Sequence, residues 1–125
     1  MGRRFLRLAA TISGQDLLVQ AASIQAEAHL ATCFGFVAGV FDIDGGTASA
    51  AYLQQSISAL VSACQRLLPL GQTQAHEILW NLKPAILRAC EASSATPASY
   101  MNCFTTLLDV ASARHATLYT RLFMS

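Results

Sequence analysis

Histidine is the residue type in this sequence that could most readily bind a metal or transfer a proton. The three histidines, His29, His76 and His115, lie far apart and have no second ligand at the spacing of one helical face. His76 and Glu77 are adjacent, but Trp80 stands where a zinc-peptidase motif would need its second histidine. The sequence therefore predicts neither catalytic residues nor a metal site.

Cysteines are the other candidate ligands or nucleophiles, and they are equally scattered. They are Cys33, Cys64, Cys90 and Cys103. No Cys-x-x-Cys pair occurs, so the pattern does not indicate a closed zinc site. The start of the sequence does not have the pattern of an export signal, so we expect reduced, buried cysteines that behave as small apolar residues.

The string Asp42-Ile43-Asp44-Gly45 resembles the start of a calcium-binding loop. The later oxygen ligands and the glutamate at the twelfth position of such a loop are missing, so calcium is not predicted. A turn is the better interpretation, with an aspartate or Thr47 capping the next helix.

Composition narrows the class of protein. The 125 residues are 54% hydrophobic and 12% charged, against about 25% charged residues in an average domain. We expect one domain over residues 1–125, with some apolar surface covered by a partner.

The net charge of +1 gives no electrostatic footprint for nucleic acid. The most apolar run, residues 30–41, is shorter than the roughly 20 residues that cross a bilayer, so no membrane span is predicted.

Hydrophobic residues recur at helical spacing, and strand-like alternation is absent, so the predicted fold is all-α, a compact bundle of about six helices. The predicted helical segments are 2–11, 15–28, 29–41, 48–68 and 74–91. Phe5, Leu8, Ala9 and Ile12, at helical spacing along and just after the first of them, form its predicted inward face, and Gly14 is predicted to break the run. Pro84 should kink or interrupt the last one near Leu82.

Residues 29–41 are apolar nearly all round, which predicts a buried helix. Gly35 and Gly39 are four residues apart and would allow another helix to approach closely.

A corner with the sequence Arg-Leu-Leu-Pro-Leu-Gly-Gln-Thr joins the two longest predicted helices, at residues 66–73. Pro69 cannot continue the first helix, Gly71 suits a tight reversal, and Gln72 or Thr73 can cap the second helix, with Thr73 as the predicted N-cap. The leucines predict a corner packed against a core. The residues singled out here are Arg66, Pro69, Gly71 and Gln72.

The last residues combine aromatic, apolar and arginine side chains, which interface centres favour. The tail residues concerned are Arg114, His115, Tyr119, Arg121, Leu122 and Phe123. Two interpretations stay open: a terminal helix packed on its own core, or a segment that docks on another protein.

These two stretches resemble the urease accessory protein UreF family. The corner matches Arg-Leu-x-Pro-Leu-Gly-Gln-Thr, and residues 111–125 match Ala-Ser-x-Arg-His-x-x-x-Tyr-x-Arg-Leu-Phe-x-Ser. The resemblance covers the family's C-terminal half only, because the proline- and glycine-containing motif of its N-terminal half has no counterpart. We therefore expect a UreF-like helical domain whose N-terminal half is missing.

The resemblance implies a non-enzymatic chaperone scaffold for nickel insertion into urease. It implies a cytoplasmic homodimer that binds UreD (also called UreH), recruits or regulates the GTPase UreG, and acts on apo-urease. It implies no cofactor, since nickel is handled by the assembly. The tail residues Arg114, His115, Tyr119, Arg121, Leu122 and Phe123 would then bind the partner. Two alternatives remain: a nickel-binding relay that uses histidines or a cysteine, and a truncated remnant without function.

Overall fold

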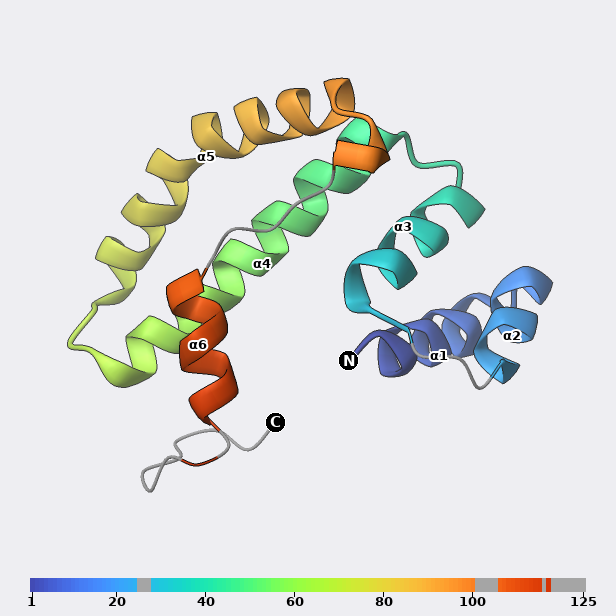
Figure 1. The fold of residues 1–125 in the computed structure, drawn as a ribbon, viewed down its shortest axis with the longest axis horizontal. Coiled ribbons are helices and arrows are strands. Elements are labelled where there is room, and N and C mark those ends of the chain that lie inside the picture. Colours follow the sequence, from blue (N-terminus) through green and yellow to red (C-terminus); the bar gives the residue numbers. More distant parts are fainter. Residues whose placement is uncertain (25–27, 101–105, 116, 118–125) are drawn as a thin grey trace. The chain divides into compact units, whose positions relative to one another are not determined.

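The computed structural model describes residues 1–24, 28–100, 106–115 and 117 (Figure 1). Contacts divide the chain into two units, Met1–Ala95 and Thr96–Ser125. The first unit contains α1 (Gly2–Ser13), α2 (Asp16–Ser23), α3 (Leu30–Val40), α4 (Gly45–Leu67) and α5 (Gln72–Ala95). The second contains the short 3₁₀ helix η1 (Ala98–Tyr100) and α6 (Thr106–His115). In the part of the chain that is described, all regular structure is helical, which confirms the predicted all-α fold with six α-helices. The prediction of one domain over residues 1–125 stays a prediction.

Helix α1 buries Gly2, Leu6 and Ala10, which are four residues apart and form one stripe along the helix. The predicted inward face was wrong in part, because Leu8 is 58% exposed and Ile12 is 77% exposed. The other two residues predicted to face inward are half-buried at the edge of the core. The buried stripe follows from a contact between Gly2 and the backbone of residues 28 and 29, and not from the apolar periodicity of α1.

That contact brings the start of α1 against the backbone just before α3. A Cβ atom at Gly2 would lie 2.8 Å from the carbonyl carbon of His29 and closer still to the carbonyl oxygen of Ala28. Real Cβ atoms do not approach backbone atoms at such distances, so this position requires glycine. The absence of a side chain therefore fixes how closely α1 and α3 pack.

Helix α1 ends where the sequence predicts, at Gly14. This residue has φ +64°, and its N–H donates to the Ala10 carbonyl oxygen at 3.0 Å. Glycine is favoured there because the left-handed conformation costs it little. Helix α2 follows at once but ends at Ser23, five residues before the predicted end at residue 28, because Ile24 adopts extended backbone angles.

The core of the first unit lies among α1, α2 and α3. Its buried members are Leu6, Ala10, Leu18, Cys33 and Val37. Leu18 is completely inaccessible, although α2 has only eight residues. Two of the cysteines predicted to be buried, in α3 and α5, are buried; Cys64 is exposed, contrary to the prediction, and Cys103 lies outside the described residues.

Helix α3 is less buried than its composition predicts. Only Cys33, Val37 and Ala38 are buried, while Phe36 remains 42% exposed. The predicted close helix packing at Gly35 and Gly39 is also wrong, since no described atom outside the helix's own backbone lies within 4 Å of a Cβ built on either glycine. One side of α3 is therefore open to solvent.

A Schellman motif ends α3 and sets the direction of the chain toward α4. Asp42 has φ +53°, and its N–H donates to Gly39 O at 3.2 Å, while the Ile43 N–H donates to Ala38 O at 2.9 Å. Aspartate tolerates this left-handed conformation better than most residues. The predicted turn at residues 42–47 is thus the exit of α3 and the entry of α4.

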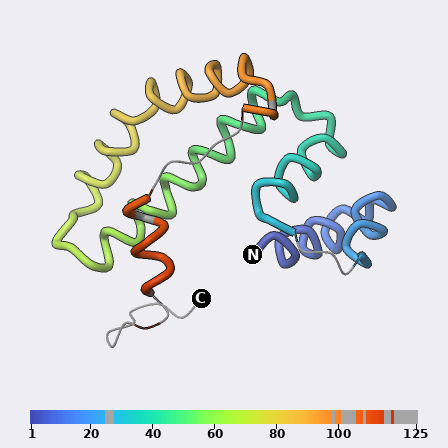
Figure 2. The backbone as a smooth tube through the Cα atoms, viewed as in Figure 1, coloured from blue at the N-terminus to red at the C-terminus, as the bar shows by residue number. Residues whose placement is uncertain are grey.

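Helices α4 and α5 pack side by side as a hairpin (Figures 1 and 2). Their buried residues are few, Val61 on α4 and Ala75, Ile86 and Cys90 on α5. Pro84 lies within α5, which continues through it and changes direction in its middle (Figure 1). The sequence thus predicted the bend correctly, but the helix is not interrupted. Within the described part of the chain, no helix has both the length and the apolar character needed to cross a membrane.

Three aromatic rings connect the hairpin to the first three helices. The ring centroids of Phe5 and Phe34 are 5.6 Å apart with planes 16° apart, and those of Phe34 and Tyr52 are 5.5 Å apart at 60°. Both arrangements are favourable geometries for aromatic pairs. We call these three residues the aromatic ladder; it links α1 to α3 and α3 to α4.

We predict that Gly2→Ala lowers the free energy of unfolding by about 1–3 kcal/mol, because the added methyl group must displace the backbone of residues 28 and 29. Gly35→Ala is the matched control. It meets no neighbour and should be neutral or stabilising by up to about 1 kcal/mol, as alanine usually is in a helix. Urea titrations followed by circular dichroism measure both; equal stability of Gly2→Ala and the wild type would contradict the close α1–α3 contact.

Candidate functional site

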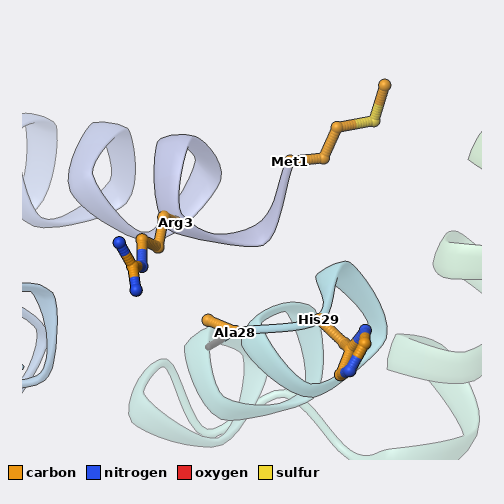
Figure 3. A pocket seen from close by; sticks show the side chains of 4 residues that line it. All are labelled: Met1, Arg3, Ala28 and His29. Atoms are coloured by element: carbon orange, nitrogen blue, oxygen red, sulfur yellow. The ribbon is translucent and has the colours of Figure 1, made fainter. Parts of the chain in front are cut away.

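A pocket at the start of α1 brings an arginine and a histidine to one surface hollow. It has a volume of about 320 Å³ and is lined by Met1, Arg3, Ala28 and His29 (Figure 3). Figure 3 shows the side chains of Arg3 and His29 pointing away from each other. This arrangement does not bring an acid and a base together on a common substrate atom.

The histidines are placed separately by the fold. His29 is the exposed residue just before α3, and His115 is the last residue of α6. The Nδ1 of His76 lies 2.8 Å from the Gln72 carbonyl oxygen, so Nδ1–H donates this bond. Among the described residues, no three histidine, cysteine or acidic side chains are grouped as metal ligands would be.

The corner residues singled out in the sequence lie at the end of α4 and the start of α5. Arg66 is in the last turn of α4, and Pro69 lies in a tight turn in which the Leu70 N–H donates to the Leu68 carbonyl oxygen at 2.7 Å. The corner is not packed against a core as predicted, because Leu67 is 51% exposed and Leu68 is 60% exposed. The corner therefore presents apolar side chains to solvent.

The start of α5 uses a different cap from the predicted one. Thr73 lies inside the helix, which begins at Gln72. Gly71 occupies the capping position: its carbonyl oxygen accepts from the Ala75 N–H at 3.0 Å, and its own N–H donates to Gln74 Oε1 at 3.2 Å. This is the side-chain half of a capping box, made by the glutamine three residues into the helix.

The described part of the tail is the C-terminal half of α6. Arg114 is exposed there and shares one helical face with Leu107, which is 87% exposed, and Val110, which is 50% exposed. The Thr117 N–H donates to the Arg114 carbonyl oxygen at 3.0 Å and closes the last turn. The other predicted partner-binding residues, Tyr119, Arg121, Leu122 and Phe123, and the side chain of His115, lie outside what the structure describes.

Trp80 is a surface feature that sequence reasoning missed. The indole is 68% exposed, and the Lys83 ammonium nitrogen lies 4.1 Å from the ring centroid. A cation three residues after an aromatic residue on a helix is the sequence signal for this contact. Together with Thr73, His76 and Glu77, Trp80 lines an open hollow on α5.

Asp44 is a carboxylate whose pKa is shifted by the hydrogen bonds that it accepts. It caps α4, accepting a hydrogen bond from the Thr47 N–H at 3.0 Å. Hydrogen bonds from the side chain and the backbone of Thr47 lower the pKa of Asp44 below its ordinary value of 3.8. The predicted aspartate cap is confirmed, and the role of this residue is structural.

An all-helical chain that carries aromatic and apolar side chains on its surface has the character of a protein-binding module. The UreF family model matches residues 1–83, and the chain belongs to the UreF family. This match includes the corner at residues 66–73.

Curated relatives agree with the family match. The urease accessory protein UreF of a Picosynechococcus strain is 39% identical over 97 residues, which cover 78% of this chain and 43% of that protein. The UreF proteins of a Nostoc strain and of Bacillus sp. strain TB-90 are 33% and 30% identical, over the whole chain and over 54% and 57% of their own lengths. The chain thus spans about half the length of the curated relatives it matches.

We predict that Asp44→Ala lowers the midpoint of urea unfolding at pH 7, because the Thr47 N–H loses its acceptor. A carboxylate whose pKa is lowered in the folded state contributes stability above its unfolded pKa and loses it as pH falls through the folded value. The difference between wild type and Asp44→Ala should therefore shrink below pH 3.8. Asp44→Asn, which keeps an acceptor without a charge, is the control, and its midpoint relative to Asp44→Ala should not depend on pH in this range. A wild-type advantage that persists unchanged below the lowered pKa would contradict this assignment.

Proposed function

We propose that this chain is a non-enzymatic accessory scaffold in urease maturation. Membership of the UreF family, carried by the match over residues 1–83, is the observation on which the proposal rests. The relatives are named urease accessory proteins. The scaffold binds UreD/UreH, recruits or regulates the GTPase UreG, and acts with them on apo-urease.

The second unit supplies the proposed docking segment for UreD/UreH. The exposed face of α6, formed by Leu107, Val110 and Arg114, gives a partner apolar area beside a positive charge. Burying such apolar side chains against a partner stabilises a complex, and arginine forms strong hydrogen bonds with carboxylates. The remaining proposed partner-binding residues, His115, Tyr119, Arg121, Leu122 and Phe123, continue the same part of the chain.

Nickel is cargo of the proposed assembly, and we propose no resident cofactor. The chain works as a homodimer in the cytoplasm in this proposal. The separate placement of the described histidines supports scaffolding over a nickel relay, and a nickel titration of the purified chain followed by calorimetry distinguishes the two functions.

We predict that deletion of residues 114–125 abolishes binding of this chain to UreD/UreH. The charge reversal Arg114→Glu should weaken binding by about tenfold or more, because it puts a like charge opposite the partner's acidic groups. Pull-down and calorimetric titration with purified UreD/UreH measure both effects.

Arg88→Glu is the matched control, since Arg88 is an exposed arginine of the other unit, on α5. It should bind as the wild type does. Equal loss in both arginine variants would show a nonspecific charge effect and contradict the tail assignment. An intact, folded chain that does not bind UreD/UreH would support the remnant alternative instead.

A further inference from the structure

Helix α1 carries a positive charge that the rest of the chain does not share. It contains Arg3, Arg4 and Arg7 and no acidic residue, whereas the other residues of the chain include five basic and seven acidic side chains. All three arginines are exposed, and Arg7 lies three residues after Arg4 and four after Arg3. Like charges at this spacing repel each other on a helix surface, so a negatively charged partner relieves the repulsion.

Apolar surface borders these arginines. Leu8 is 58% exposed and lies four residues after Arg4, on the same face of α1. A groove of about 380 Å³ lies beside Arg7, between α1 and α2, which pack against each other (Figure 1). The residues that line the groove are Arg7, Ala10, Thr11, Val19, Ala22 and Ser23. We call the surface formed by Arg4, Arg7, Leu8 and this groove the arginine face.

The arginine face is better suited to a separate partner than to the interior of its own chain. Burying guanidinium groups in an apolar core is costly unless carboxylates accompany them, and α1 supplies none. An acidic partner brings those carboxylates, and guanidinium groups form paired, charge-assisted hydrogen bonds with them. Charge complementarity therefore indicates an acidic binding partner.

The groove specifies the form of that partner. Val19, which is 51% exposed, and its alanine neighbours offer a concave apolar surface that fits a single side chain, in contrast to the flat surface of a membrane. Side chains four residues apart on a helix are about 6 Å apart, which matches the spacing of Arg4 and Arg7. We propose that the arginine face binds an acidic amphipathic helix of a partner protein, with carboxylates on the two arginines and an apolar side chain in the groove.

A synthetic peptide of this chemistry tests the proposal. The probe is a fluorescein-labelled, alanine-based helix with two glutamates four residues apart and leucines beside them. The control peptide has glutamine in place of each glutamate. Fluorescence anisotropy measures the binding of both peptides to the 125-residue chain, and amide chemical shifts of the isotope-labelled chain identify the residues that the peptide contacts.

We predict that the glutamate peptide binds and that Arg7→Glu weakens its binding at least about tenfold, because a like charge then faces the peptide's carboxylates. Val19→Glu, which puts a carboxylate into the groove, should weaken binding as well. Arg88→Glu, the same charge reversal at an exposed position of α5, is the matched control and should bind as the wild type does. The glutamine peptide should bind at least about tenfold more weakly, and shift changes should be confined to α1 and α2.

Equal weakening by Arg7→Glu and Arg88→Glu would overturn the proposal, because the peptide would then respond only to overall charge. Shift changes centred on other helices, or no binding of the glutamate peptide, would overturn it too. Phosphatidylglycerol vesicles test a lipid surface: vesicle binding that Arg7→Glu abolishes, without peptide binding, would assign the face to a membrane instead. Deletion of residues 114–125 should leave peptide binding unchanged, so this proposal and the proposed UreD/UreH docking can fail separately.

Discussion

The aromatic ladder is the interaction on which the arrangement of the first unit depends. Phe34 contacts Phe5 on one side and Tyr52 on the other, at centroid distances of 5.6 and 5.5 Å. The core among α1, α2 and α3 consists of small and medium side chains, and the α4–α5 hairpin buries few residues of its own. The ladder therefore joins the three-helix core to the hairpin through ring contacts on α1, α3 and α4.

Local signals in the sequence predicted much of this fold. Gly14 ended α1, Asp44 capped α4, and Pro84 bent α5, because each effect is encoded within one helical turn. The inward face of α1 and the end of α2 could not be predicted in the same way. Gly2 sets that face through a contact with the backbone of residues 28 and 29, and this contact is invisible to helical periodicity.

The same distinction applies to the candidate site. The apolar composition of α3 predicts that the helix is covered, but it does not identify the covering segment. In the structure Phe36 is 42% exposed, and no described atom outside the helix's own backbone lies within 4 Å of a Cβ built at Gly35. The corner motif identified the family correctly while its Thr73 cap was wrong, because family motifs and capping chemistry are separate kinds of information. The proposed scaffold role joins these observations: a chain of helices with open apolar faces and an arginine-bearing α6 suits binding more than catalysis.

Native-state hydrogen exchange of the 125-residue chain tests the central claim most directly, namely that these residues hold their own core and present the rest of their apolar surface for binding. Slowest exchange is predicted at Leu6, Ala10, Leu18, Cys33 and Val37, with faster exchange toward the corner of the hairpin. Phe34→Leu removes the ring that contacts both Phe5 and Tyr52, so it should speed exchange in α1 and in α4. The effect should be larger in α4, because α4 buries only Val61 whereas α1 also packs into the core. Uniformly fast exchange along α1 and α3 would contradict the account, since the chain would then have no stable core from which to act as a scaffold.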